Sequence, residues 1–115
     1  MIILFIITGC YDPLPTANII NKTNGNLFIE QYEAPNYFYR SVEKNKTTQV
    51  VLHCNLLIQK KQKQYEYNFC NRNSKINHKS GAIYRLEVLE DMNLNIEGAL
   101  IPPIQTRKVE QPLEQ

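Results

Sequence analysis

Residues 48–70 read TQVVLHCNLLIQKKQKQYEYNFC, and this stretch decides the fold class. Thr48–Gln59 alternates apolar and polar side chains, and Tyr65–Cys70 alternates again after the polar turn Lys60–Gln64. A period of two residues is typical of a half-buried β-strand. The stretch therefore predicts a long strand and a shorter strand that return on each other as an antiparallel hairpin.

Comparable short runs occur along the rest of the chain, and aromatic and β-branched residues, which favour strands, are frequent in them. These runs are Asn26–Tyr32, Tyr37–Val42, Ile83–Leu89 and Leu94–Ile101, the last of which ends at Pro102 and Pro103. No segment longer than two helical turns has a helical period. We therefore predict an all-β domain over residues 26–103, an antiparallel immunoglobulin-like β-sandwich of about six or seven strands. Residues 104–115 are expected to give one more edge strand or a disordered tail.

The N-terminus carries the clearest functional signal. Met1–Gly9 reads MIILFIITG without a charge, and its apolar run is far too short for a membrane-spanning helix but close to the length of a signal-peptide core. The next residues, Ile7, Thr8, Gly9 and Cys10, resemble the bacterial lipobox. This resemblance implies that residues 1–9 are removed and that the Cys10 thiol takes a diacylglycerol group. The alternative is a buried N-terminal strand over Ile2–Ile7.

Residues 10–25 are expected to form a tether between the lipid and the domain. Pro13 and Pro15 stiffen this segment, and Asn18, Asn21 and Asn24 favour turns. A lipid anchor places the protein at the bacterial cell envelope, on the outer membrane by our interpretation.

Export would leave Cys54 and Cys70 in an oxidising compartment, where a disulfide is possible. If the hairpin is centred on Gln62, Cys54 faces Cys70, but Leu56 then faces Asn68. A shift by one residue pairs Leu56 with Tyr67 and buries one apolar face, but sends Cys70 to the other face. A bulge would reconcile the two arrangements. Both a disulfide and two free thiols therefore stay open.

Other candidate sites are weaker. Tyr32, Tyr37 and Tyr39 form an aromatic group that would pack in the core and across strands or, where exposed, contact a glycan or protein. Lys60, Lys61 and Lys63 are interpreted as a solvated turn that discourages edge pairing. The net charge of +2 and the expected export argue against nucleic acid as a partner. No catalytic motif and no familiar metal-ligand spacing occurs, so we predict no enzyme activity, no metal and no cofactor.

Residues 81–103, GAIYRLEVLEDMNLNIEGALIPP, resemble a recurring pattern in a family of Bacteroidota envelope lipoproteins whose molecular function is unassigned. The matching positions are Gly81, Tyr84, Leu86, Val88, Ile101 and Pro102, and the start Cys10-Tyr11-Asp12-Pro13 is also similar. Members of that family are usually longer, so this chain would match only their N-terminal immunoglobulin-like module, as a short relative or as a fragment. The resemblance implies a role beside outer-membrane nutrient-uptake systems and supplies no catalytic residues.

The sequence thus predicts a lipid-anchored, non-catalytic binding or scaffolding module at the cell envelope. The alternatives are an accessory glycan- or peptide-binding protein of an outer-membrane uptake system, and a truncated fragment of a longer lipoprotein.

Overall fold

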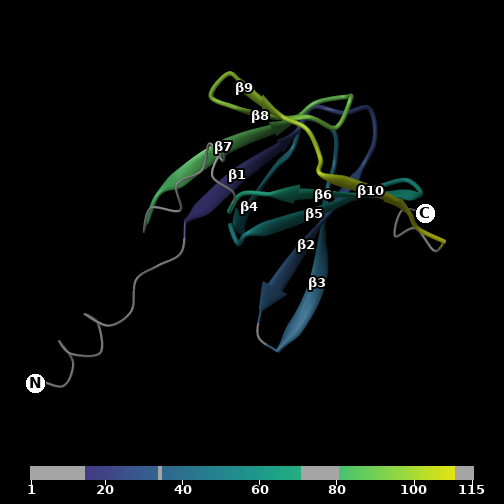
Figure 1. Ribbon diagram of the computed structural model, residues 1–115, viewed down its shortest axis with the longest axis horizontal. Helices are drawn as coiled ribbons and strands as arrows, with labels where there is room; N and C mark the ends of the chain where they lie inside the picture. Colours follow the sequence, from purple (N-terminus) through teal and green to yellow (C-terminus); the bar gives the residue numbers. More distant parts are fainter. Residues whose placement is uncertain (1–14, 34, 71–80, 111–115) are drawn as a thin grey trace, which may run out of the picture.

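The computed structural model describes residues 15–33, 35–70 and 81–110, which fold into ten β-strands (Figure 1). The strands are β1 (Thr16–Asn21), β2 (Leu27–Glu33), β3 (Asn36–Val42), β4 (Thr47–Val51), β5 (Asn55–Lys60), β6 (Lys63–Asn68), β7 (Ile83–Val88), β8 (Leu94–Ile96), β9 (Ala99–Ile101) and β10 (Gln105–Lys108). The described ranges contain no helix that could span a bilayer. The predicted all-β class is confirmed, although six or seven strands was too low a number.

The strands form two five-stranded sheets that pack face to face. One sheet has the order β4-β1-β7-β8-β9 and the other has the order β10-β6-β5-β2-β3. The β1–β7 pair is parallel, and all other pairs are antiparallel. This arrangement is the predicted immunoglobulin-like β-sandwich, in which inward-facing side chains of both sheets share one core.

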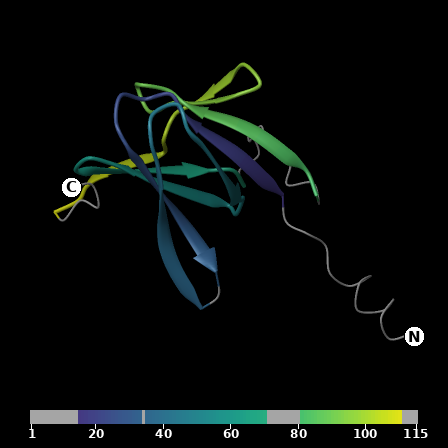
Figure 2. The same ribbon diagram turned by 180° about the vertical axis from the view of Figure 1, so that it is seen from behind.

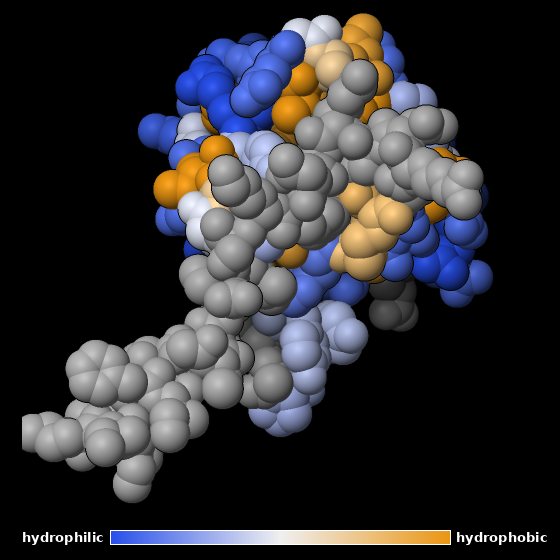
Figure 3. All heavy atoms as spheres, turned by 60° about the vertical axis from the view of Figure 1, so that its left-hand side comes forward, coloured by the Kyte–Doolittle hydropathy of each residue, from blue (hydrophilic) through white to orange (hydrophobic). Residues whose placement is uncertain are grey.

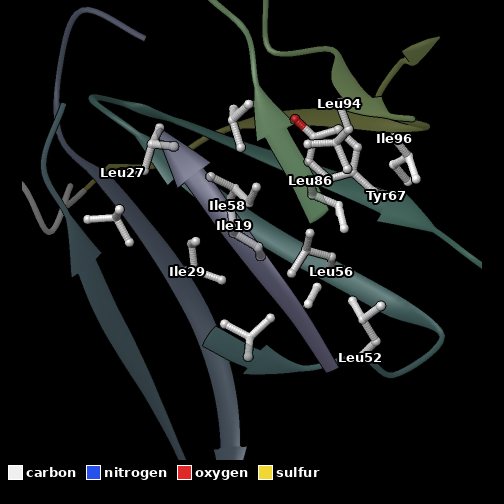
Figure 4. Packing of buried hydrophobic residues seen from close by; sticks show 14 of the residues in the cluster. Ile19, Leu27, Ile29, Leu52, Leu56, Ile58, Tyr67, Leu86, Leu94 and Ile96 are labelled. Carbon is white, nitrogen blue, oxygen red and sulfur yellow. The ribbon is translucent and has the colours of Figure 1, made fainter. Parts of the chain in front are cut away.

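The core lies between the sheets (Figure 4). Alternate residues of most strands point into it, and many of them are fully buried: Ala17, Ile19, Leu27, Ile29, Ile58, Tyr67, Leu86, Val88 and Leu94. The Tyr67 hydroxyl is also buried and donates a hydrogen bond of 2.6 Å to the Met92 carbonyl oxygen. A buried phenol needs such a partner, because an unpaired hydroxyl in the core is costly.

The predicted tether is wrong for Thr16–Asn21, which form β1. This strand pairs with β4 on one side and with β7 on the other, so it lies inside its sheet. Asn21 ends the strand as a fully buried residue whose amide nitrogen donates to the carbonyl oxygens of Gly25 (2.7 Å) and Val42 (2.8 Å). Its side-chain oxygen accepts from the backbone nitrogen and the hydroxyl of Thr23. The asparagine therefore fixes the turn that leads into β2.

The predicted single strand Thr48–Gln59 is in fact two strands in different sheets. β4 ends at Val51, the chain crosses at residues 52–54, and β5 begins at Asn55. Val50, Leu52, Leu56 and Ile58 are all buried, so the chain faces the core on both sides of the crossing, while Cys54 within it is exposed. A strand that changes sheets at the corner of a sandwich keeps facing the same core, which explains why the alternation in the sequence is uninterrupted.

The predicted strand Leu94–Ile101 is a hairpin of β8 and β9. Ile96 pairs with Ala99, and the two turn residues Glu97 and Gly98 both have positive φ values, 51° and 89°. Two consecutive residues with positive φ are typical of the tight turn that joins antiparallel strands. Residues 105–108 of the tail form the edge strand β10, which pairs with β6. An edge strand was one of the two expectations for the tail.

Cys10 and the other residues of the predicted lipobox, Ile7, Thr8 and Gly9, lie outside the described residues, as do residues 11–14 of the predicted tether. The lipidation of Cys10 stays a prediction.

Candidate functional site

The β2–β3 hairpin extends beyond the sandwich as an arm (Figures 1 and 2). β2 pairs with β3 along its whole length, from Leu27–Val42 to Glu33–Asn36. It pairs with β5 only at Phe28–Gln59 and Ile29–Ile58. Past Ile29, β2 therefore has a hydrogen-bonded neighbour on one side alone. We use the term arm for residues 30–32 and 35–40.

The arm displays aromatic side chains. Tyr32 and Tyr37 are a cross-strand pair with ring centroids 4.7 Å apart and planes tilted by 47°. They are 44% and 67% exposed, and Tyr39 is 36% exposed. On the other face of β3 the Arg40 guanidinium lies 5.7 Å from the Phe38 ring centroid. Two-stranded hairpins gain little stability of their own, so these rings contribute more to a contact surface than to the core.

Tyr39 belongs to a polar row across the same sheet. Its hydroxyl donates to Glu30 Oε2 over 3.2 Å and accepts from Gln64 Nε2 over 3.5 Å. Arg107 donates to Gln64 Oε1 over 3.1 Å, so the row reaches β10. Partial burial, followed by the nearby Glu30 carboxylate, raises the pKa of Tyr39 above its usual value of 10.0. Tyr39 is thus held as a neutral hydrogen-bond donor, whereas Tyr32 and Tyr37 lie outside this row of bonds.

A cleft of about 360 Å³ opens between the arm and the start of β5. It is lined by Glu30, Tyr32, Tyr37, His53, Cys54, Asn55 and Leu57. Asn55 and Leu57 alternate with the buried Leu56 and Ile58, so the cleft lies on the outer face of the sheet rather than in the core. Apolar and polar groups converge there in the mixture that small-molecule and peptide sites use.

A disulfide between Cys54 and Cys70 borders the cleft, with the two Cα atoms 5.0 Å apart. The β5–β6 ladder has the register that pairs Leu56 with Tyr67 and Ile58 with Tyr65. The disulfide, which the sequence left open beside two free thiols, and the register that buries one apolar face therefore occur together. The ladder runs only from Asn55–Asn68 to Lys60–Lys63, so the cysteines lie beyond its end and strand alternation does not constrain Cys70.

The structure brings together only some of the predicted site residues. Tyr32 and Tyr37 share the cleft with Cys54, while Tyr39 lies beside it in the polar row. Sequence reasoning missed Glu30, Asn55 and Leu57. Glu30 was detectable, because it lies two residues before Tyr32 and so faces the same side of the strand. Asn55 and Leu57 could not be detected from the sequence, because their position depends on the sheet crossing at residues 52–54.

Metal binding gains no support within the described ranges, where no group of three or more His, Cys, Asp or Glu side chains is placed to hold an ion. The lysines predicted at a turn do lie there, with Lys61 in the β5–β6 turn and Lys60 paired with Lys63 beside it. Lys60 also forms an ion pair of 2.8 Å with Glu90, and its hydrogen bond lowers the pKa of that carboxyl.

Hydrophobic residues on the face shown in Figure 3 form small groups separated by hydrophilic ones. Comparison of the chain with protein-family models, with curated proteins and with solved structures found no match. The function has to be inferred from the residues of the chain itself.

Proposed function

We propose that the chain is a bacterial lipoprotein, anchored in the outer membrane of the cell envelope through lipid on Cys10, whose β-sandwich is a non-catalytic binding or scaffolding module. The observation that carries this proposal is the sequence Ile7-Thr8-Gly9-Cys10 after an uncharged apolar run. β1 begins at Thr16, so only five residues would separate a lipidated Cys10 from the folded domain.

The chemistry of the anchor accounts for the residue types. The Cys10 thiol is the nucleophile for the lipid, and Thr8 and Gly9 are small enough for a peptidase to approach the backbone before the cysteine. Each buried methylene contributes about 0.8 kcal/mol, and a stable anchor takes two or more acyl chains. The freed amine of Cys10 provides the second attachment point in this class of protein.

The disulfide fits the same proposal. Structural disulfides form and persist in oxidising compartments such as the periplasm and the cell surface. Cys54 and Cys70 are both exposed, so reductants of a reducing compartment would reach their bond. Export of the chain explains why this pair is used as a disulfide.

Fatty-acid labelling tests the anchor. Cells that express the chain are fed an alkyne-tagged fatty acid, and the tag is then detected on the purified protein. We expect label on the unaltered chain and none on Cys10→Ala. The matched control is the double variant Cys54→Ala, Cys70→Ala, which removes the other cysteines and is expected to keep the label. Label that persists in Cys10→Ala, or its absence from the unaltered chain, would contradict the anchor.

A second candidate function is the capture of a glycan or peptide in the cleft. It is favoured by the volume of about 360 Å³ and by the exposed Tyr32–Tyr37 pair beside Asn55 and Glu30. Aromatic faces with adjacent hydrogen-bonding groups suit sugar rings and peptide side chains. A glycan array with Tyr37→Ala tests this idea, with Leu100→Ala as a control that removes a similarly exposed side chain (59%) elsewhere on the surface. Equal binding by the two variants would exclude the cleft.

A further inference from the structure

The strand register identifies which residues lie at the end of the sandwich where β1 begins. Thr16 pairs with Val51 of β4 and with Ile83 of β7, so these three side chains form a row across that sheet. Val51 is 41% exposed and Ile83 is 66% exposed. We call this the tether end, because residues 10–15 join the domain at Thr16.

The arm and the cleft belong to the same end. The Leu52 nitrogen donates to the Pro15 carbonyl oxygen over 2.9 Å, and the next residues, His53 and Cys54, line the cleft beside Tyr32 and Tyr37. β2 starts at the opposite end, after the turn that Asn21 fixes, and runs back toward the tether end. Figures 1 and 2 show the arm projecting from the body on the side toward which the start of β1 also points.

Exposed apolar and aromatic side chains are concentrated there. Seven large hydrophobic side chains of the described residues are exposed. Four of these seven lie here: Val51 and Ile83 at the tether end, and Tyr32 and Tyr37 at the far end of the arm, which we call the arm tip. The lysines have the opposite distribution, whereas the charged residues Glu30 and Arg40 lie on the arm. The lysines of the described residues follow β1 or flank the β3–β4 and β5–β6 turns and the end of β10, all away from the tether end: Lys22, Lys44, Lys46, Lys60, Lys61, Lys63 and Lys108.

The length of the tether limits how far this end can lie from the anchor. Six peptide units join Cys10 to Thr16, and a fully extended chain advances at most about 3.5 Å per residue, so Thr16 stays within roughly 20 Å of the lipidated residue. Tyrosine is enriched at membrane interfaces, because its ring suits the acyl boundary and its hydroxyl suits water and headgroups.

We propose that the arm tip and the tether end rest on the surface of the bilayer that holds Cys10, with Tyr32, Tyr37, Val51 and Ile83 in the headgroup region and the lysine-bearing end directed away from it. This inference deepens the proposed function and depends on its lipid anchor. It identifies the lipid surface as the partner of the exposed aromatic pair, in place of a glycan or a protein.

The chain contains no tryptophan, so one introduced indole is a unique fluorescent reporter. The lipidated full chain carrying Tyr37→Trp is reconstituted into phosphatidylcholine vesicles with brominated or unbrominated acyl chains. We expect a loss of fluorescence in the brominated vesicles. The matched control is Lys61→Trp, at the opposite end, whose fluorescence is expected to be the same in both kinds of vesicle. Ile83→Trp is a second reporter at the tether end, in case Tyr37→Trp fails to fold.

The mass of the reconstituted protein separates the two proposals. If the mass shows acyl chains and the Tyr37→Trp and Ile83→Trp fluorescence is equal in both vesicles, the bilayer contact is wrong and the anchor stands. If the tryptophan fluorescence changes on addition of glycan and not with bromination of the lipid, the aromatic pair binds the cleft ligand. This result also contradicts the proposed contact with the bilayer. If the mass shows no acyl chains, the anchor and the contact are both wrong.

Discussion

At the residue scale, Asn21 holds the corner between β1 and β2. Its amide forms four hydrogen bonds in a site with no solvent exposure, and these bonds join the 22–25 turn to the end of β3. Asparagine is favoured at turns because its side chain imitates backbone hydrogen bonding. In this chain the same side-chain hydrogen bonding ends a central strand. For this reason the turn-favouring residues Asn18, Asn21 and Asn24 suggested a tether in the sequence.

Asn21→Ala is expected to lower the free energy of unfolding by about 2–4 kcal/mol, because it leaves the buried Val42 carbonyl oxygen and the partly buried Gly25 carbonyl oxygen without this donor. Urea denaturation followed by circular dichroism measures the change. The control is Asn18→Ala in the same strand, where the side chain is half-buried, and it should cost much less. Similar losses in the two variants would contradict the role of Asn21.

Tyr67 makes stability sensitive to alkaline pH. Burial, and to a smaller extent the nearby Tyr65 and Asp91, raises its pKa far above the usual 10.0. In the unfolded chain the phenol ionises near pH 10, whereas in the folded chain it keeps its proton. Its contribution to stability is therefore complete below pH 10 and is lost as the pH rises above that value.

The free energy of unfolding should fall above pH 10, and Tyr67→Phe should remove most of this slope. At neutral pH the same variant should be less stable by about 1–2 kcal/mol, because the Met92 carbonyl loses its donor. Denaturation at a series of pH values tests both effects. A slope that is the same in the variant and in the unaltered chain would assign the alkaline loss to other groups.

At the scale of elements, the disulfide closes the open end of the β5–β6 hairpin. The Phe69 nitrogen donates to the Cys54 carbonyl oxygen over 2.7 Å next to the disulfide. A hydrogen bond and a covalent bond therefore both join the two segments at this end of the hairpin. A crosslink between residues 16 positions apart restricts the unfolded chain and contributes about 3 kcal/mol on the chain-entropy model.

The double variant Cys54→Ser, Cys70→Ser should therefore unfold at a lower urea concentration, with a loss of up to about 3 kcal/mol. A thiol reductant should destabilise the unaltered chain by a similar amount and leave the double variant unchanged. If the reductant has no effect on the unaltered chain, the two cysteines are not bonded in solution.

Much of the fold was predictable because local alternation reports which face of a strand is buried. Leu56, Ile58 and Tyr67 were placed correctly on one face by that pattern. The pattern gives no information on where a strand changes sheets, so the crossing at residues 52–54 was missed. β1 was missed because Pro15 and three asparagines masked the buried residues Ala17 and Ile19. The cleft depends on that crossing and on the early end of the β2–β5 pairing, and neither has a local signal.

At the scale of the whole molecule, the two ends of the sandwich differ in character. The tether end combines the arm, the disulfide and exposed aliphatic side chains, whereas the other end combines lysines with the Lys60–Glu90 ion pair. The proposed anchor at Cys10 would give this difference a direction, with one end near the membrane and the other directed away from it. Without an anchor, the same surface would be explained only by the cleft and its ligand.

The lipid anchor is tested most directly by the intact mass of the protein from its native membrane fraction, compared with that of Cys10→Ala. We expect a species that begins at residue 10 and is heavier by the mass of acyl chains, and we expect this species to be lost in the variant. An unmodified chain that retains Met1 would contradict the anchor. Ile2–Ile7 would then become a candidate strand, and the proposed contact with the bilayer would lose its basis.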